Sequence, residues 1–278
     1  MNLRFIDEAL DFYDIDKKYK AELINCINDI TRNEALEQKV KDIYDILYIK
    51  RDYSYKELWK RYNIEELFGQ AVNPFITNLI LILGYNKHLE NINNYSLDAN
   101  QIQIHKKRVK ACFCNDIEQR GYRGIRISQM LWGSYFVNIR LLEVGVLQFE
   151  NAGNGIIKIH IPAQTKLFIE EVKNSIFNSK EVIEKYFKLK NITYICDSWL
   201  LSKELNEIIS EETNINKFYK LFDVQSGLEC NRDLLNFVYK LQNCDNYNDL
   251  AENTSLQKII KKELIQGTSF KKGIGTLN

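Results

Sequence analysis

The sequence contains few of the residues that interrupt regular structure. Its 278 residues include only two prolines and twelve glycines. This composition argues against low-complexity disorder, and no repeat period is visible. A hydrophobic content of 45% and an aromatic content of 12% are enough to bury a large core. We therefore expect a globular protein with one large domain or two moderate ones.

An excess of either charge is also lacking. The 38 basic and 37 acidic side chains give a net charge of +1, so the overall field gives no reason to expect nucleic acid or an anionic membrane as a partner. The strongest basic run is HKKRVK, His105 to Lys110. Such a run could dock an acidic carrier protein or nucleic acid, but it more often forms the solvated face of a helix.

Signals for export, membrane spanning and metal binding are missing as well. The first residues, MNLRFIDEALDFYDID, lack the basic and apolar regions of a secretion signal, and the longest apolar run, in FITNLILILGY, is too short to cross a bilayer. The six cysteines are scattered and form no C-x-x-C pair, which predicts reduced thiols in a cytoplasmic protein. Dinucleotide, Walker and zinc patterns are absent, so we expect no structural metal.

The apolar residues up to about residue 140 recur at helical spacing, as in Leu23, Ile27 and Ile30. This period predicts six to eight helices in a mostly helical N-terminal domain, residues 1–140. The expected breaks are Thr31 to Asn33, Arg51 to Tyr53, Gly69 to Pro74, and Asn91 to Asn100.

From Leu141 the pattern changes to that of a mixed α/β domain, residues 141–278, so the predicted fold class is α+β. VGVLQFE and IIKIHIP predict two strands joined as a hairpin through NAGNG. Thr165 to Leu189 has helical spacing, and NITYICDSW returns to strand character. A strand, helix, strand unit normally forms a right-handed crossover, so IIKIHIP and ITYICDSW should run parallel in one sheet.

Four further elements follow in the C-terminal part of the chain. Helices are expected from Ser202 to Ile209 and from Asn214 to Leu221, and LLNFVYKL reads as a strand. A last helix should begin at Asn253 or Thr254, because Thr254-x-x-Gln257 fits a capping box, and it should stop at Gly267.

The two parallel strands bring His160, Cys196, Asp197 and Ser198 to one edge of the sheet, where open α/β sheets usually bind ligands. His160 could remove a proton from an amine or orient a reactive group, or it could be a partly buried histidine satisfied by a backbone carbonyl. Asp197 and Ser198 could polarise a carbonyl, protonate a thiolate or hold His160, although an Asp or Ser before a helix is also an ordinary N-cap. Cys196 suggests a thiol nucleophile, but a strand cysteine is more often a small buried hydrophobe.

Several ordered motifs carry a resemblance to a known family. They are RGYRGI followed by Trp132, RLLEVGVLQFE from Arg140 to Glu150, IHIP from Ile159, CDSWLL from Cys196, TNINKF from Thr213 and TSLQK from Thr254. With these motifs the chain resembles bacterial acyltransferase-domain proteins, in which a helical N-acyltransferase N-terminal domain precedes a C-terminal domain similar to the GNAT N-acetyltransferases.

This resemblance implies a GNAT-like sheet in which LQFE, IIKIHIP and ITYICDSW are the third, fourth and fifth strands. The last two would splay to admit a pantetheine arm. The backbone of Ile159 and Ile161 would pair with the pantetheine amides, while the helix after IPAQTK, with Gln164, Thr165 and Lys166 at its start, would hold a phosphate. IPAQTKL has no glycine, and the usual Q/R-x-x-G-x-G/A phosphate loop is absent. Both coenzyme A and an acyl carrier protein therefore remain as donors.

The same resemblance implies roles for four side chains. His160 is the first candidate for the general base and Glu150 is the second. Ser198 is the candidate proton donor to the departing thiolate, with Asp197 as orienter. Acyl transfer would be direct, without an acyl-enzyme.

The leading hypothesis is therefore an N-acyltransferase that moves an acyl group, fatty chains included, from a pantetheine thioester to an amine of a small molecule or peptide. A second hypothesis is a noncatalytic binding module that keeps the fold and recruits an acyl carrier or peptide. A third is a thiol enzyme that uses Cys196 with His160.

Overall fold

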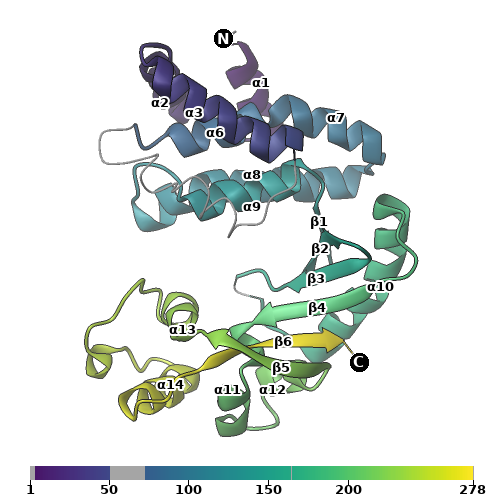
Figure 1. Cartoon of the computed structure of the whole chain (residues 1–278), viewed down its shortest axis with the longest axis vertical. Helices are drawn as coiled ribbons and strands as arrows, with labels where there is room; N and C mark the ends of the chain where they lie inside the picture. The colour runs from purple at the N-terminus through teal and green to yellow at the C-terminus, as the bar shows by residue number, and fades with distance from the viewer. Residues whose placement is uncertain (1–3, 51–72, 164, 278) are drawn as a thin grey trace. The chain divides into compact units, whose positions relative to one another are not determined.

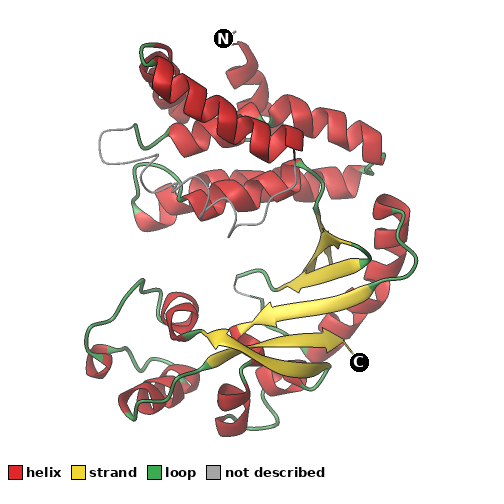
Figure 2. Cartoon of the chain, viewed as in Figure 1, coloured by secondary structure: helices red, strands yellow, loops and turns green. Residues whose placement is uncertain are grey.

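A computed structural model describes residues 4–50, 73–163 and 165–277. The chain forms two compact units, residues 1–142 and 143–278. Figure 1 labels the helices and strands of both units, and Figure 2 shows that the strands gather in one of them. The predicted division into functional domains at residue 140 stays a prediction.

The first unit is helical, as its periodicity predicts. Its elements are α1 Arg4–Tyr13, η1 Lys17–Tyr19, α2 Lys20–Thr31, α3 Glu34–Tyr44, the π-helical η2 Asp45–Lys50, α6 Ile76–Leu83, α7 Tyr85–Tyr95, α8 Ala99–Arg120 and α9 Ile127–Val137. One continuous core runs through them, with Leu23, Leu79, Phe113 and Phe136 all fully buried. α1 and α3 each bury one apolar stripe, whereas α6 is buried from Ile76 to Ile82, so packing removes apolar surface from water.

The breaks between these helices follow local capping chemistry. The predicted break after Thr31 is confirmed, because the Asn33 side chain accepts a hydrogen bond from Leu36 N at 3.1 Å and starts α3. The break predicted over Asn91 to Asn100 is too long. α7 continues to Tyr95, and only Ser96 to Asp98 separate it from α8. The break predicted at Arg51 to Tyr53, and most of the one at Gly69 to Pro74, lie outside the described residues.

The basic run HKKRVK lies within α8 and is only partly solvated. His105 and Val109 are fully buried. The Lys106 ammonium lies 4.7 Å from the centre of the Phe12 ring, and Lys110 forms an ion pair of 2.6 Å with Asp14. The run therefore contributes to packing α8 against α1, as well as forming part of the exposed helix surface.

The second unit is built around a mixed sheet. Its strands are β1 Leu141–Val144, β2 Leu147–Gly153, β3 Ile156–His160, β4 Thr193–Ser198, β5 Phe222–Glu229 and β6 Lys271–Leu277, in the spatial order β1-β2-β3-β4-β6-β5. β2 and β3 pair antiparallel as the predicted hairpin, and β3 and β4 pair parallel as predicted for the crossover. β6 pairs antiparallel with both β4 and β5. Both predicted strand pairings are therefore confirmed, but VGVLQFE is not one strand, because a turn at Gly145 and Val146 separates β1 from β2.

Helices complete this unit. They are α10 Ile169–Phe187, η3 Trp199–Leu201, α11 Lys203–Ile208, α12 Asn214–Tyr219, α13 Asn231–Val238, η4 Tyr247–Asp249 and α14 Ser255–Ile265. The helices predicted after Ser202 and Asn214 are confirmed, and so is the Thr254–Gln257 capping box. Gly267, with φ +86°, follows the last helix at the predicted stop.

The prediction of a strand at LLNFVYKL is wrong. Most of this segment belongs to α13, where Leu234 and Leu235 are buried in a small core with Leu264 and Phe270. Adjacent leucines with Val238 one turn later also fit the buried stripe of a helix, and tertiary packing selected that alternative. Strands β5 and β6 were not predicted. Because only β1 precedes LQFE in the described sheet, LQFE, IIKIHIP and ITYICDSW are its second, third and fourth strands.

The sheet has two chemically different faces. One carries Leu147, Phe149, Ile157, Tyr194 and Cys196, which are buried on the side of α10. Ser179 of α10 forms a hydrogen bond of 2.6 Å with the Tyr194 hydroxyl there. The opposite face, called here the polar face, carries Gln148, Glu150, Lys158, His160, Ile195 and Asp197. The assignment follows from strand register and from the alternation of side chains along each strand.

Candidate active site

Strands β3 and β4 stop pairing before either strand ends. Their parallel register runs from Ile156 and Thr193 to Lys158 and Ile195. β3 nevertheless continues to His160, which pairs with Gln148 of β2. β4 continues to Ser198, which pairs with Gly273 of β6. The sheet therefore opens between the C-terminal tips of these two parallel strands.

Every second residue of β3 points its backbone N–H and C=O groups toward this opening. The carbonyl of Gly155 accepts a hydrogen bond from Thr193 N at 2.9 Å, so the odd-numbered residues of β3 turn their backbone groups toward β4. This alternation continues to Ile159, one residue beyond the last registered pair. The backbone groups of Ile159 therefore face the side of β3 on which pairing with β4 has ended. The pantetheine-binding roles of Ile159 and of Ile161, which follows the strand, stay predictions.

His160 and Glu150 form a close pair on the polar face. His160 Nε2 lies 2.7 Å from Glu150 Oε2, and the Glu150 side chain is 4% exposed while that of His160 is 29% exposed. β2 and β3 place them diagonally, because His160 is registered with Gln148 and Glu150 with Lys158. An ionised carboxylate can only accept a hydrogen bond, so Nε2–H is the donor and Nδ1 carries the imidazole lone pair in the neutral ring. This geometry matches a general base with an orienting carboxylate.

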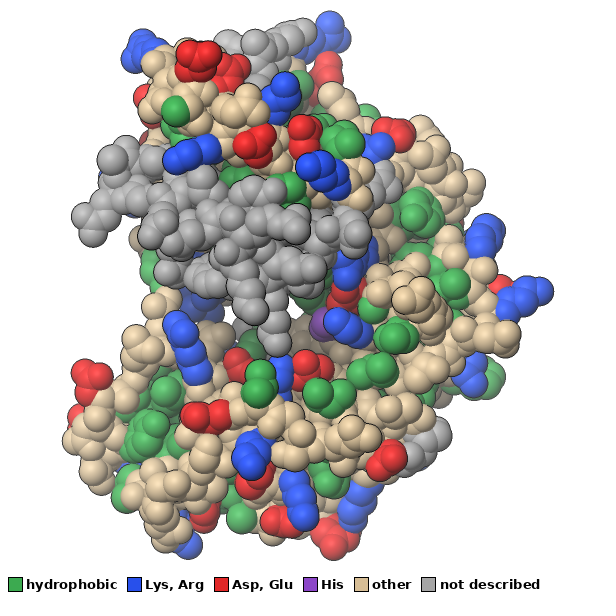
Figure 3. All heavy atoms as spheres, viewed as in Figure 1, with side chains coloured by type: hydrophobic (Ala, Val, Ile, Leu, Met, Phe, Trp, Pro, Cys, Tyr) green, Lys and Arg blue, Asp and Glu red, His purple; other side chains and the backbone are tan. Residues whose placement is uncertain are grey.

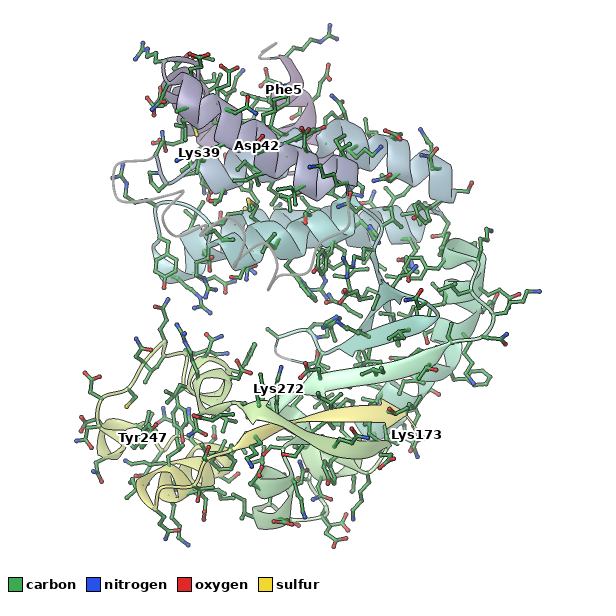
Figure 4. The ribbon with its side chains drawn as sticks, in the orientation of Figure 1. Phe5, Lys39, Asp42, Lys173, Tyr247 and Lys272 are labelled. Atoms are coloured by element: carbon green, nitrogen blue, oxygen red, sulfur yellow. The ribbon has the colours of Figure 1, made fainter. Side chains whose placement is uncertain are left out.

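Asp197 lies on the polar face but contacts a different partner from the one predicted. Its carboxylate forms an ion pair with Lys272 Nζ at 2.8 Å. Lys272 belongs to β6 and is labelled in Figure 4. Asp233, in the first turn of α13, interacts electrostatically with both the Lys272 ammonium and the Asp197 carboxylate. Burial raises the pKa of its carboxyl, and the Lys272 ammonium opposes that rise. The predicted role of Asp197 as orienter of His160 stays a prediction, and the carboxylate bonded to His160 in the structure is Glu150.

Ser198 and Cys196 lie on the opposite face from His160, because β4 alternates regularly while it pairs with β6. The Ser198 hydroxyl oxygen accepts a hydrogen bond from Leu200 N at 3.2 Å and caps η3. Cys196 is fully buried, and burial raises the pKa of its thiol. A thiolate at Cys196 directed toward His160 is therefore incompatible with this arrangement. The pairing of Cys196 with His160 that the thiol-enzyme hypothesis needs is therefore not found among the described residues.

The segment that follows β3 differs from its prediction. α10 begins at Ile169, so Thr165 and Lys166 precede the helix instead of forming its first turn. Thr165 N donates to Pro162 O at 3.2 Å, and the Lys166 carbonyl accepts a hydrogen bond of 3.1 Å from the Asn214 side chain. Gln164 lies outside the described residues.

The N-terminus of α10 is also poorly suited to hold a phosphate. Its first turn carries two acidic side chains, Glu170 and Glu171, so the phosphate-binding roles of Thr165 and Lys166 stay predictions. Carboxylates in the first turn compensate the partial positive charge at the N-terminus of the helix, and they repel an incoming anion.

Comparison with known proteins identifies the architecture. A model of the GNAT-like C-terminal domain matches residues 118–277, which is more than half of the chain. The chain belongs to this family. The match includes every strand of the GNAT-like sheet and both members of the His160–Glu150 pair. The resemblance seen in the motifs is thereby confirmed.

Solved structures with a similar fold extend over nearly the whole chain. An acyltransferase in complex with decanoyl-CoA has a TM-score of 0.73 at 15% identity and covers 98% of this chain and 86% of its own. A mutant acyltransferase in complex with octanoyl-CoA has a TM-score of 0.75 at 15% identity, and the match covers 98% of this chain and 87% of the other. An acyltransferase in complex with decanoyl-CoA and teicoplanin has a TM-score of 0.74 at 15% identity, and the match covers 98% of this chain and 86% of the other. A comparison with curated proteins gave no match. At this identity the likeness establishes the fold.

Metal-binding clusters and membrane-spanning helices are both absent from the described part of the chain. Within it, no group of three or more His, Cys, Asp or Glu side chains is arranged to hold a metal ion. None of the described helices is both long and apolar enough to cross a bilayer. The face seen in Figure 3 shows acidic and basic side chains intermingled, without a broad field of one sign.

Two features of the site escaped prediction from sequence. Lys272 lies on β6, a strand whose glycines and lysines gave no strand signal, and α13 brings Asp233 near it. The direct His160–Glu150 contact was also not foreseen, although both residues were candidates for the base. The only available signal was the hairpin, since residues on the same face of paired strands become neighbours once the register is known.

Proposed function

We propose that this protein is an N-acyltransferase that moves an acyl group, including a fatty one, from a pantetheine thioester to an amine of a small molecule or peptide. The observation that carries the proposal is the opening between β3 and β4 beside His160, whose ring is bonded to the buried Glu150. The family match and the fold shared with acyltransferases that hold acyl-CoA support it. Coenzyme A is accordingly our first choice of donor, and an acyl carrier protein is the second.

The donor would enter the opening as an additional strand. A pantetheine arm carries two amides, and the backbone of Ile159 faces the gap where the ladder between β3 and β4 has ended. Hydrogen bonds to backbone groups hold an extended ligand in a fixed register. The thioester carbonyl would then lie near the tips of the two strands, next to His160.

His160 would act as the general base in direct transfer. The acceptor amine loses a proton to Nδ1 as its nitrogen bonds to the thioester carbon, and the Glu150 carboxylate stabilises the imidazolium that forms. Breaking the carbon–sulfur bond then releases the thiolate. A thiol has a pKa of about 8.5, so a thiolate is an adequate leaving group near neutral pH. A dedicated proton donor, the role predicted for Ser198, is therefore not required.

Release of free thiol tests this function. The full chain is incubated with coenzyme A thioesters of several chain lengths, or with acylated carrier protein, in the presence and absence of an amine panel. We expect thiol release that depends on the amine, an amide product of the matching mass, and loss of both in His160→Ala. Tight donor binding without turnover, across all donors and amines, would instead support a noncatalytic binding module.

A further inference from the structure

Lys158 is the one basic side chain of the polar face without a partner among the described residues. The other two basic groups near it are engaged: His160 with Glu150 at 2.7 Å, and Lys272 with Asp197 at 2.8 Å. Within the described chain the Lys158 ammonium forms neither an ion pair nor a side-chain hydrogen bond. A charged group is therefore left over beside the proposed reaction centre.

The position of Lys158 makes this unusual. β3 lies in the interior of the sheet, and Lys158 belongs to the last pair that it forms with β4. The side chain is partly buried. Its cross-strand neighbour Glu150 is the nearest candidate for a counter-ion, but the Glu150 carboxylate is directed to His160 and makes no ion pair with Lys158 among the described residues. A cation over the middle of a sheet is costly to desolvate unless an anion reaches it.

Lys158 also lies within reach of whatever His160 deprotonates. The two residues are two positions apart on the same face of β3, so their Cα atoms are about 6.5 Å apart along the strand. A lysine stem is long and flexible, which lets its ammonium follow a group bound next to the imidazole. A single small molecule can therefore contact both side chains.

We propose that Lys158 binds an anionic group of the acceptor, so that the acceptor is an amine that also carries a carboxylate, such as an amino acid or a peptide. This inference rests on the proposed acyltransferase function. The amine would lie at His160 and the carboxylate at Lys158, where it would complete the missing ion pair. A neutral amine would leave the ammonium uncompensated and would bind more weakly.

The experiment compares matched acceptors on matched variants. Each amine is used as its free carboxylate and as its carboxamide, which removes the charge and keeps the shape. Lys158→Gln should raise KM for the carboxylates about 10- to 100-fold, the range expected for a lost hydrogen bond to a charged group, and leave the carboxamides unchanged. Lys158→Arg should restore part of the preference. The control is Lys173→Gln, which removes a lysine from the exposed surface of α10, 54% exposed and labelled in Figure 4, and should change neither class.

Two results would overturn the proposal. Equal KM values for carboxylates and carboxamides in the unmodified protein would show that the acceptor needs no anion. An equal loss of kcat for both classes in Lys158→Gln would mean that the ammonium acts on the thioester oxygen instead of the acceptor. Thermal melts confirm that the variants fold.

Failure of the proposed function is distinguishable, because it appears as absence of amine-dependent thiol release in the unmodified protein. Calorimetric binding of the same acceptor pairs to the unmodified and Lys158→Gln proteins then still decides the role of Lys158. Preferential binding of carboxylates that is lost in the variant supports it, and equal binding of both classes refutes it.

Discussion

His160 Nε2 lies 2.7 Å from Oε2 of Glu150, a carboxylate that the sheet buries almost completely. The buried carboxylate fixes the orientation and the tautomer of the imidazole ring through this hydrogen bond. The His160 side chain is partly exposed, so a ligand can reach part of the ring. In the proposed reaction the two residues have different roles. His160 would exchange a proton with the acceptor, and Glu150 would be a positioning residue that acts through it.

Substitutions in this pair should affect turnover more than donor binding. His160→Ala should lower kcat about 10²- to 10⁴-fold, the usual contribution of a general base, with little change in donor affinity. Glu150→Gln should lower kcat less and change the pH profile, because the amide keeps the shape without the charge. Steady-state kinetics and donor binding by calorimetry measure these effects. A Glu150→Gln variant with an unaltered pH profile would contradict the positioning role.

Cys196→Ala should retain acyl transfer. The thiol is fully buried on the side of the sheet opposite His160, and burial raises its pKa, so it contributes packing and no nucleophile. Intact mass after incubation with the acyl donor is the direct measurement, and we expect no covalent adduct in the unmodified protein. An acyl adduct that disappears in Cys196→Ala would restore the two-step thiol mechanism.

Ser198→Ala should reduce stability and leave chemistry intact. The hydroxyl caps η3 through Leu200 N, and loss of a serine cap costs about 1 kcal/mol. Denaturant unfolding should show this loss, whereas kcat should match that of the unmodified protein. A fall in kcat as large as that of His160→Ala, at unchanged stability, would instead make Ser198 the proton donor.

His88 should make the helical unit sensitive to acid. It is fully buried, its Nδ1 lies 2.9 Å from the Tyr13 hydroxyl, and burial together with the nearby His105 lowers its pKa well below the usual value. Folded His88 thus stays neutral where the unfolded chain binds a proton. Its contribution to stability is complete above about pH 6.5 and is lost as the pH falls below that value, by at most about 1.4 kcal/mol per pH unit.

The measurement for His88 is unfolding by denaturant between pH 7.5 and pH 5.5. A His88→Gln variant is the control, because glutamine preserves polarity and does not titrate. The pH dependence of unfolding should be shallower in the variant. Parallel pH dependences for both proteins would show that His88 carries none of the acid sensitivity.

The sequence predicts elements well where local signals agree. Asn33, Ser202 and Thr254 each precede an apolar helical run, and each proved to be an N-cap. The alternation of apolar and polar residues in IIKIHI coincides with the buried and partly exposed faces of β3. The predictions fail where local signals conflict with packing. LLNFV is rich in strand-like residues, yet it became helical because Leu234 and Leu235 complete a small core with Phe270.

The start of α10 shows a second kind of failure. Periodicity extended the helix back to Thr165, but Leu167 adopts φ +50° and the helix begins only at Ile169. A single backbone conformation moved Lys166 out of the first turn and left two glutamates there. Element boundaries depend on such local geometry, which composition and spacing do not report.

By itself, the amino-acid sequence determined the helical and mixed halves, the hairpin, the parallel crossover and the face on which His160 lies. These follow from hydrophobic period and capping, which act over a few residues. Only the tertiary structure decided that Glu150 rather than Asp197 contacts His160 and that Asp197 forms an ion pair with Lys272. It also decided that Lys158 has no ion-pair partner among the described residues. Those choices depend on strand register and on where pairing between β3 and β4 ends, and register is set by contacts between residues distant in the chain.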